Sequence, residues 1–257
     1  MAAEVVLLLR GLVREKRHWL NFPSQVAQQL NVPVLTLDVP GCGALCQQPS
    51  PLSIQQMRQQ LQQQFGLQFP QHRHARLHLC AISMGGMLAL DWAVAAPAQV
   101  ASLVLINSSS ALSPFWHRLR PAQYFTLLRC MLSRQPEQRE ALIWQLTSNQ
   151  PLQPEVIQQW VHIACESPVS AANAARQLWA AARFRPVTKA QCPVLVLASQ
   201  ADRLVDWQCS ERLARWLNAE VRLHSEAGHD LPLDDPHWLL AQLKLFYSKV
   251  KCGLPAI

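Results

Sequence analysis

The segment CAISMGGMLAL, residues 80–90, joins the end of one apolar run to the start of another and places Ser83 at the junction. The run RLHLCAI (76–82) before it is typical of a buried strand, and GGMLALDWAVAAP (85–97) after it is typical of a helix. Ala81 and Gly85, two positions before and after the serine, are small enough for strand and helix to approach closely. The segment therefore predicts a strand, a sharp turn at Ser83 and a helix.

Similar apolar runs recur along the chain, and helix-like patterns separate the first five of them. The six predicted strands are EVVLLL (4–9), VPVLTLDV (32–39), RLHLCAI (76–82), SLVLIN (102–107), PVLVLAS (193–199) and EVRLHS (220–225). Nearly continuous apolar strands are what a parallel sheet covered on both faces requires. The sequence predicts an α/β protein with a mainly parallel six-stranded sheet flanked by helices. One such helix is expected over 53–66, with Ser53 as its N-cap and Gly66 as its C-terminal cap.

The strand pattern disappears between the fourth and fifth strands. This part of the chain is rich in leucine and alanine and is broken by Pro121, Pro136, Pro151, Pro154 and Pro168, which mark the boundaries of short helices. We expect about four helices here, forming an inserted cap over 113–185, with the core made of 1–112 and 186–257. The cap contains eight Arg, four Glu, no Lys and no Asp.

Composition restricts the class of protein. The formal charge is +7, but Lys and Arg are dispersed and not interleaved with aromatic residues, which argues against nucleic-acid binding. No apolar run is long enough to span a membrane, and the first one is too short for a signal peptide. The eight cysteines have irregular spacing, which favours reduced thiols in the cytoplasm. No cofactor and no metal are predicted, since His72, His74 and His78 have no helix to align them as ligands.

A nucleophilic serine needs a histidine base that is oriented by a third group. Asp202 in LASQADRLVD follows the fifth strand, and His229 in HSEAGHDLPLDDP follows the sixth. Sites in open α/β sheets form at such strand ends, and serine, acid, histidine is the expected chain order. Ser83, Asp202 and His229 are therefore the predicted catalytic residues. Asp206 is the rival acid, but it is better interpreted as the N-cap of a helix.

The nucleophile also needs donors that stabilise a developing oxyanion. The backbone N–H of the residue after the nucleophile, Met84, is the first expected donor, and the loop after the first strand supplies the second. In LLLRGLVREKRHW (7–19) that second donor is most plausibly the N–H of Leu12, and Gly11 lets the loop bend.

Taken together, LLLRG with Trp19 eight residues on, LDVPGCG, AISMGG, ASQADRLV and EAGHDLPLDDP resemble the α/β-hydrolase superfamily over nearly the whole chain. The likeness is greatest to its small capped esterases and lyases, a group that includes pimeloyl-carrier-protein methyl ester esterase and a menaquinone-pathway lyase. The resemblance implies the same triad and oxyanion residues, and a strand order of 2-1-3-4-5-6. Two positions depart from the family pattern: Arg10 replaces a histidine, and Ala81 replaces the first glycine of the turn.

The leading hypothesis is a serine hydrolase that cleaves a carboxylic ester or thioester through an acyl-enzyme. A lyase that uses the same triad as a base is the first alternative, because related folds support many chemistries. A non-catalytic protein that binds a small ligand is the second. The expected partner is a small acyl ester or thioester, and the basic cap is compatible with an acidic carrier protein.

Overall fold

The computed structural model describes residues 3–253, so the outermost residues of the predicted core, 1–2 and 254–257, lie outside the described residues. The strands form one parallel sheet in the order β2-β1-β3-β4-β5-β6, which confirms the predicted order. They are β1 (Glu4–Leu9), β2 (Val34–Leu37), β3 (Arg76–Ile82), β4 (Val100–Ile106), β5 (Val194–Ser199) and β6 (Glu220–His224).

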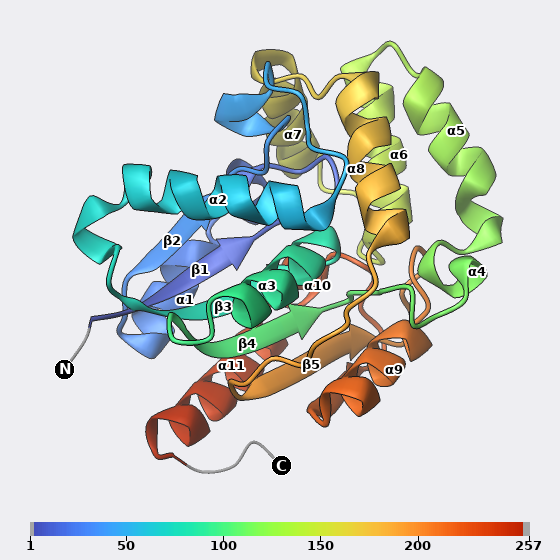
Figure 1. Cartoon of the computed structure of the whole chain (residues 1–257). Helices are drawn as coiled ribbons and strands as arrows, with labels where there is room; N and C mark the ends of the chain where they lie inside the picture. The colour runs from blue at the N-terminus through green and yellow to red at the C-terminus, as the bar shows by residue number, and fades with distance from the viewer. Residues whose placement is uncertain (1–2, 254–257) are drawn as a thin grey trace.

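Helices cover both faces of the sheet (Figure 1). Those outside the β4–β5 connection are α1 (Phe22–Leu30), α2 (Ile54–Gln68), α3 (Met84–Ala95), α9 (Gln208–Leu217), α10 (Leu231–Asp234) and α11 (Pro236–Lys251). Short 3₁₀ turns occur at η1 (Lys16–Trp19), η2 (Gly43–Leu45), η3 (Pro70–His72) and η4 (Pro121–Gln123).

The alternation of side chains along each strand divides the core into two layers. In β1, Val5, Leu7 and Leu9 pack with buried side chains of α2, α3 and α9 on one face. Val6 and Leu8 point to the other face, where they join apolar side chains of α1 and α11. Two covered faces explain why the central strands are apolar at nearly every position.

The long connection between β4 and β5 is helical. It contains α4 (Phe115–Arg118), α5 (Tyr124–Leu132), α6 (Pro136–Thr147), α7 (Pro154–Glu166) and α8 (Ala171–Arg183). These are five α-helices rather than about four, because α4 is a single turn that ends before Pro121. The connection lies along one end of the sheet (Figure 1).

One helix end differs from the expectation. Ser53 caps α2 as predicted, because its hydroxyl accepts a hydrogen bond from the Gln56 N–H. Gly66 lies inside the helix, which continues to Gln68 and stops before Pro70. The proline forces Phe69 out of the helical region, so Pro70 and not the glycine ends the helix.

Across residues 3–253, no helix is both long enough and apolar enough to cross a membrane.

Candidate active site

Ser83 stands alone between β3 and α3 in a strained conformation. Its φ of 58° and ψ of −125° lie in a region that side-chain-bearing residues rarely adopt, at a cost of about 1–3 kcal/mol. Two hydrogen bonds hold it there: the Ser83 N–H donates to the Ile106 carbonyl, and the Ser108 hydroxyl donates to the Ser83 carbonyl, each at 2.8 Å. Ser83 is partly exposed while its neighbours Ile82 and Met84 are buried, so the turn presents its hydroxyl at the strand end.

The two small residues around the turn, Ala81 and Gly85, have different surroundings. A Cβ added at Gly85 would lie 2.5 Å from the carbonyl oxygens of both Leu9 and Arg10, so this position excludes any side chain. Ala81 is fully buried in β3, with Leu9 and Leu105 as its neighbours on the adjacent strands. Its methyl group is part of the core, and the missing first glycine of the motif leaves no clash.

Asp202 and His229 are brought together from separate loops. The His229 Nδ1 and the Asp202 Oδ2 are 2.7 Å apart, and both residues are buried. The other carboxylate oxygen of Asp202 accepts the backbone N–H groups of Leu204 and Val205 at 2.8 and 2.9 Å. These bonds hold the carboxylate in place with its second oxygen directed at the imidazole.

The pKa of His229 reflects competing effects. Burial alone lowers it, but the charge and hydrogen bond of Asp202, helped by Asp230, outweigh burial and Arg10 and raise the pKa of His229 above its usual 6.5. The rival acid Asp206 is not the N-cap of α9 as predicted, because the N-cap is Trp207, one residue later. Asp206 instead accepts the Gln208 N–H just before the helix and pairs with Arg120.

Asn107 is a residue to which sequence reasoning gave no role. It follows β4 with a φ of 45°, and its side-chain N–H donates to the His229 carbonyl at 2.8 Å and to the Ser199 hydroxyl at 3.1 Å. The side-chain oxygen of Asn107, Oδ1, accepts the Ser199 N–H at 2.8 Å. Asn107 thereby connects the ends of β4 and β5 to the histidine loop. The only sequence signal was an asparagine directly after a strand.

Ser83 and His229 are linked through residues 106–108 rather than directly. Within residues 3–253, no hydrogen bond joins the Ser83 hydroxyl to the His229 ring, but Ile106 and Ser108 bind Ser83 while Asn107 binds His229. Catalytic hydrogen bonds are often long before substrate binds and tighten in the complex.

The loop after β1 forms a turn that faces Ser83. The Arg14 N–H donates to the Gly11 carbonyl at 3.3 Å, and Val13 has a φ of 52°. A Cβ at Gly11 would lie 2.9 Å from the Ser83 Cβ, so only glycine allows the loop this close. Leu12 lies within the turn beside Gly11, and Met84 begins α3, where backbone N–H groups have no acceptor within the helix.

Arg10 forms a buried ion pair with the residue next to His229. Its Nη1 and Nη2 donate to the two carboxylate oxygens of Asp230 at 3.0 and 2.6 Å, and its guanidinium lies 4.8 Å from the centre of the Trp19 ring. Burial alone raises the pKa of Asp230, but Arg10 outweighs burial and holds it below its usual 3.8. The departure from the family pattern at Arg10 therefore has a partner 220 positions away.

The connection between α6 and α7 holds the two loops that carry Asp202 and His229. The Asn149 side-chain N–H donates to the Ala201 carbonyl at 3.0 Å and to the Glu226 carbonyl at 2.8 Å. The Asp230 N–H donates to the Thr147 carbonyl at 2.7 Å. A single segment of the inserted helices thus fixes the acid loop against the histidine loop.

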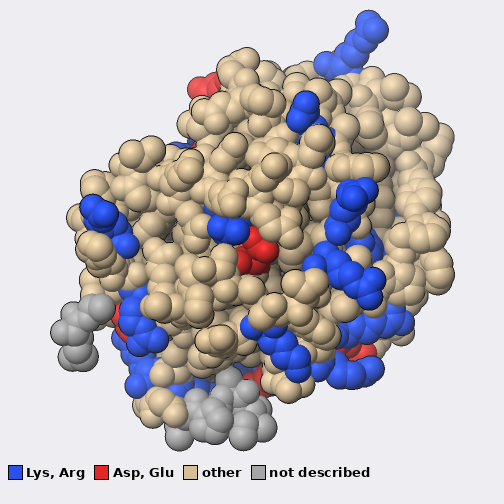
Figure 2. All heavy atoms as spheres, viewed as in Figure 1, with Lys and Arg blue, Asp and Glu red and all other residues tan. Residues whose placement is uncertain are grey.

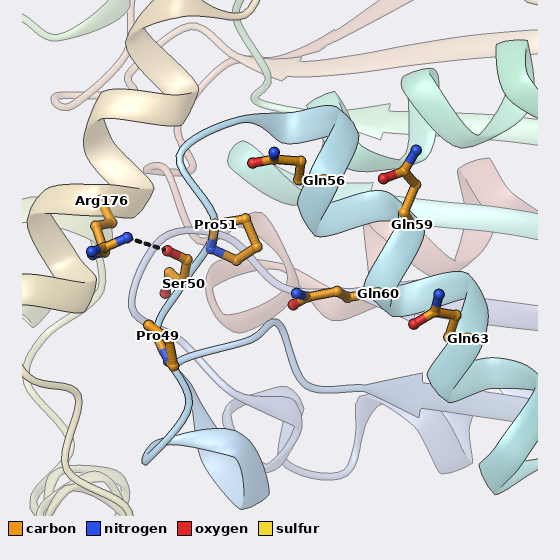
Figure 3. A pocket seen from close by; sticks show the side chains of 8 residues that line it. All are labelled: Pro49, Ser50, Pro51, Gln56, Gln59, Gln60, Gln63 and Arg176. Atoms are coloured by element: carbon orange, nitrogen blue, oxygen red, sulfur yellow. Dashed lines mark hydrogen bonds between the residues drawn. The ribbon is translucent and has the colours of Figure 1, made fainter.

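His78 and an open cavity lie apart from the predicted catalytic residues. His78 is buried on β3, with its Nδ1 2.7 Å from the Ser102 hydroxyl, and burial lowers its pKa to about 4. Among the described residues, no three His, Cys, Asp or Glu side chains form a group that could hold a metal ion. An open cavity of about 450 Å³ lies between α2 and α8 (Figure 3). Glutamines of α2, residues 49–51 and Arg176 line it, and no predicted catalytic residue does.

Relatives with similar sequences cover most of this chain. A 189-residue stretch is 32% identical to "Putative carbamate hydrolase RutD" of Variovorax paradoxus and covers 70% of each chain. The protein of the same name from Yersinia enterocolitica is 29% identical over 98% of this chain and 92% of its own length.

Among solved structures, a 2-hydroxy-6-oxo-6-phenylhexa-2,4-dienoate hydrolase from a Rhodococcus strain superposes with a TM-score of 0.77 at 20% identity. The superposition covers 96% of this chain and 91% of the chain of that hydrolase. An esterase from Thermogutta terrifontis has a TM-score of 0.74 at 20% identity, over 97% and 91% of the two chains. At such identities these structures support the fold alone. Residues 6–242 match the model of the alpha/beta hydrolase family. The chain therefore belongs to the alpha/beta hydrolase family.

Proposed function

We propose that this hydrolase cleaves a carboxylic ester or thioester through a Ser83–His229–Asp202 triad. The observation that carries the proposal is the buried 2.7 Å contact between His229 and Asp202, at the same sheet edge as the strained Ser83. The Ser83 oxygen bonds to the substrate carbonyl carbon while His229 takes its proton. His229 then gives that proton to the leaving group, and water hydrolyses the acyl-enzyme by the same two steps.

Two further groups have defined roles in this mechanism. The carboxylate of Asp202 stabilises the imidazolium form of His229, which agrees with the upward shift of the histidine pKa. The backbone N–H groups of Leu12 and Met84 stabilise the oxyanion, and the close approach of the Gly11 loop to Ser83 supports this assignment. Each such donor is typically worth about 10² to 10³ in rate.

The test is hydrolysis of p-nitrophenyl esters and acyl thioesters of increasing chain length by the wild type and by Ser83→Ala. We expect Ser83→Ala to lower kcat by about 10⁴ or more, and Ser248→Ala, at an exposed serine on α11, to leave it unchanged. A fluorophosphonate probe is expected to label Ser83. A fully active Ser83→Ala variant would contradict the triad, and elimination activity without labelling would favour the lyase.

The relatives supply a second candidate substrate class. The RutD proteins carry carbamate hydrolysis in their name, and one is 32% identical to this chain. A carbamate carbonyl carries nitrogen as well as oxygen and is open to the same attack by Ser83. Adding aryl carbamates to the ester panel distinguishes the two classes, since the better substrate has the higher kcat/KM.

We also propose an anionic leaving group, such as an acidic carrier protein. The segment 113–185 has eight Arg and four Glu, with no Lys and no Asp. Figure 2 shows Lys and Arg side chains gathered on the lower right of one face, where Figure 1 places α9 and the end of α8. Turnover of a carrier-bound thioester is expected to fall with added salt, whereas turnover of a neutral ester is not.

The free thiols of all eight cysteines favour the cytoplasm as the compartment.

A further inference from the structure

Helix α5 exposes one continuous apolar face. Tyr124, Phe125, Leu128, Met131 and Leu132 are each between 43% and 71% exposed. Their spacing of i, i+1, i+4, i+7 and i+8 places them along one side of the helix. Exposed apolar side chains are normally scattered singly, and a contiguous group indicates an interaction site. These five residues are called the α5 face below.

The opposite side of α5 is the one that packs on the protein. Leu127 and Cys130 pack with Leu142 and Leu146 of α6 in a small apolar cluster. Figure 1 shows α5 at the outer edge of the molecule, away from the sheet. The right-hand edge in Figure 2, in the same view, is formed mainly by residues without charge. The α5 face therefore points outward on a convex surface.

The preceding helix extends this surface. Phe115 and Trp116 on α4 are 69% and 50% exposed, although both are large aromatic residues. Tyr124 and Trp116 each combine an apolar ring with a polar tip, a combination that suits the boundary between an apolar phase and water. The two helices together present aromatic and aliphatic groups of the kinds found in interfacial amphipathic segments.

The charges along the chain around α5 are positive up to Pro136, and the exposed Glu137 follows in the first turn of α6. From Ser113 to Pro136 the chain has four arginines and no Asp or Glu. Arg118 binds the carbonyls of Ala181 and Ala182, and Arg120 pairs with Asp206. Arg129 and Arg134 are exposed and adjoin the face. An occupant of this surface must be apolar on contact and anionic at its rim.

We propose that the α5 face, with Arg129 and Arg134, docks on the surface of a membrane that contains anionic lipid. A lipid–water interface offers both properties together: acyl chains for Phe125 and Leu128 and phosphates for the arginines. A symmetric contact with a second copy would bring the same cationic patch against itself, with no acidic residue in the segment to neutralise it. The convex shape favours a broad surface over a groove on another protein.

The proposal is tested by co-sedimentation of the full chain with vesicles, without any substrate. Vesicles of phosphatidylcholine alone are compared with vesicles of phosphatidylcholine and phosphatidylglycerol in equal amounts. We expect wild type to bind the anionic vesicles and to be released by added salt. Phe125→Gln/Leu128→Gln should weaken binding by about tenfold or more, because the lost side chains supply apolar contact. Arg129→Gln/Arg134→Gln should weaken it by about 30-fold.

Matched controls lie elsewhere on the surface. Leu67→Gln on α2 removes an 81% exposed leucine, and Arg73→Gln/Lys244→Gln removes two exposed cations. Neither should change vesicle binding by more than about twofold, given the short reach of screened charges. An unchanged melting temperature and unchanged hydrolysis of a soluble ester show that the variants remain folded.

Three outcomes would overturn the proposal. The first is that the wild type binds neither kind of vesicle. The second is that it binds anionic vesicles and that the α5 variants bind them equally well. The third is that the wild type does not bind vesicles but forms a concentration-dependent dimer, which Phe125→Gln/Leu128→Gln abolishes. The last result would assign the α5 face to a second copy of the chain. Because binding is measured without turnover, these outcomes are independent of the proposed ester hydrolysis.

Discussion

Replacing Asp230 with asparagine removes a carboxylate that is buried next to His229 and bound to Arg10 at 3.0 and 2.6 Å. The guanidinium of Arg10 is then left buried with its charge and no counter-ion. Removing one partner of a buried ion pair costs about 3–5 kcal/mol. For a chain of this length, 1 kcal/mol corresponds to about 2 °C, so we expect Asp230→Asn to lower Tm by about 6–10 °C.

The same substitution changes the titration of His229. Asp230 raises the pKa of His229 and Arg10 lowers it. Asp230→Asn removes the first effect and leaves the second without compensation, because arginine keeps its charge. The pKa of His229 therefore falls. Since the proposed base acts in its neutral form, the rise of kcat/KM with pH moves to lower pH.

The size of the stability change also depends on pH. The pKa of Asp230 is lower in the folded chain than its usual 3.8, so its contribution to stability is complete above pH 3.8. That contribution is lost as the pH falls through the lower, folded-state value. The difference in Tm between wild type and Asp230→Asn is therefore expected to shrink as the pH falls below 3.8.

Thermal melts and pH profiles of kcat/KM on a p-nitrophenyl ester measure both effects. Arg10→Met/Asp230→Asn removes both charges and should recover part of the lost stability, about 2 kcal/mol, and move the pH profile back toward wild type. Asp91→Asn breaks a more exposed pair with Arg58 and should cost about 1 kcal/mol or less. The reasoning is refuted if Asp230→Asn melts within about 2 °C of wild type, a change of about 1 kcal/mol, or if its pH profile moves upward.

Gly85→Ala places a methyl 2.5 Å from two carbonyl oxygens, so we expect a loss of at least about 1–3 kcal/mol in a thermal melt and a fall in kcat. Ala81→Gly should keep most of the ester hydrolysis and cost about 1 kcal/mol, and a loss of activity like that of Ser83→Ala would show that the methyl supports the turn. Asn149→Ala breaks the two hydrogen bonds between the acid and histidine loops, so kcat should fall more than KM rises. An unchanged kcat in that variant would mean that the loops keep their own alignment.

The sheet was predictable because its central strands are buried on both faces and are apolar at nearly every position. The strand VLVLAS (β5) shows this, since all six of its residues are buried. The end of α2 was not, because Gly66 and Pro70 both signal a helix end and only the backbone of Phe69 shows that the proline acts. The number of inserted helices was underestimated for a similar reason, since a single-turn helix such as α4 has no periodicity to detect.

The candidate site likewise contains residues that the sequence predicted and contacts that it could not predict. Ser83, Asp202 and His229 were predicted because each follows a predicted strand, which is a local property of the sequence, and because the three occur in a fixed chain order. The partner of Arg10 was not found, because 220 positions separate it from Asp230 and no spacing rule connects them. The role of Asn107 likewise depends on which loops lie beside it in space.

The inserted helices contact the same loops that the proposed chemistry uses. Gln177 of α8 accepts the Val13 N–H at 2.9 Å in the loop after β1, and Asn149 binds the acid and histidine loops. The Thr147 carbonyl accepts the N–H of Asp230, directly after His229. A segment that only covered a pocket could change with the substrate while the triad stayed in place. Here the segment contacts the loops of the proposed base and of the proposed oxyanion donor, so we expect changes in these helices that alter substrate preference to alter kcat as well.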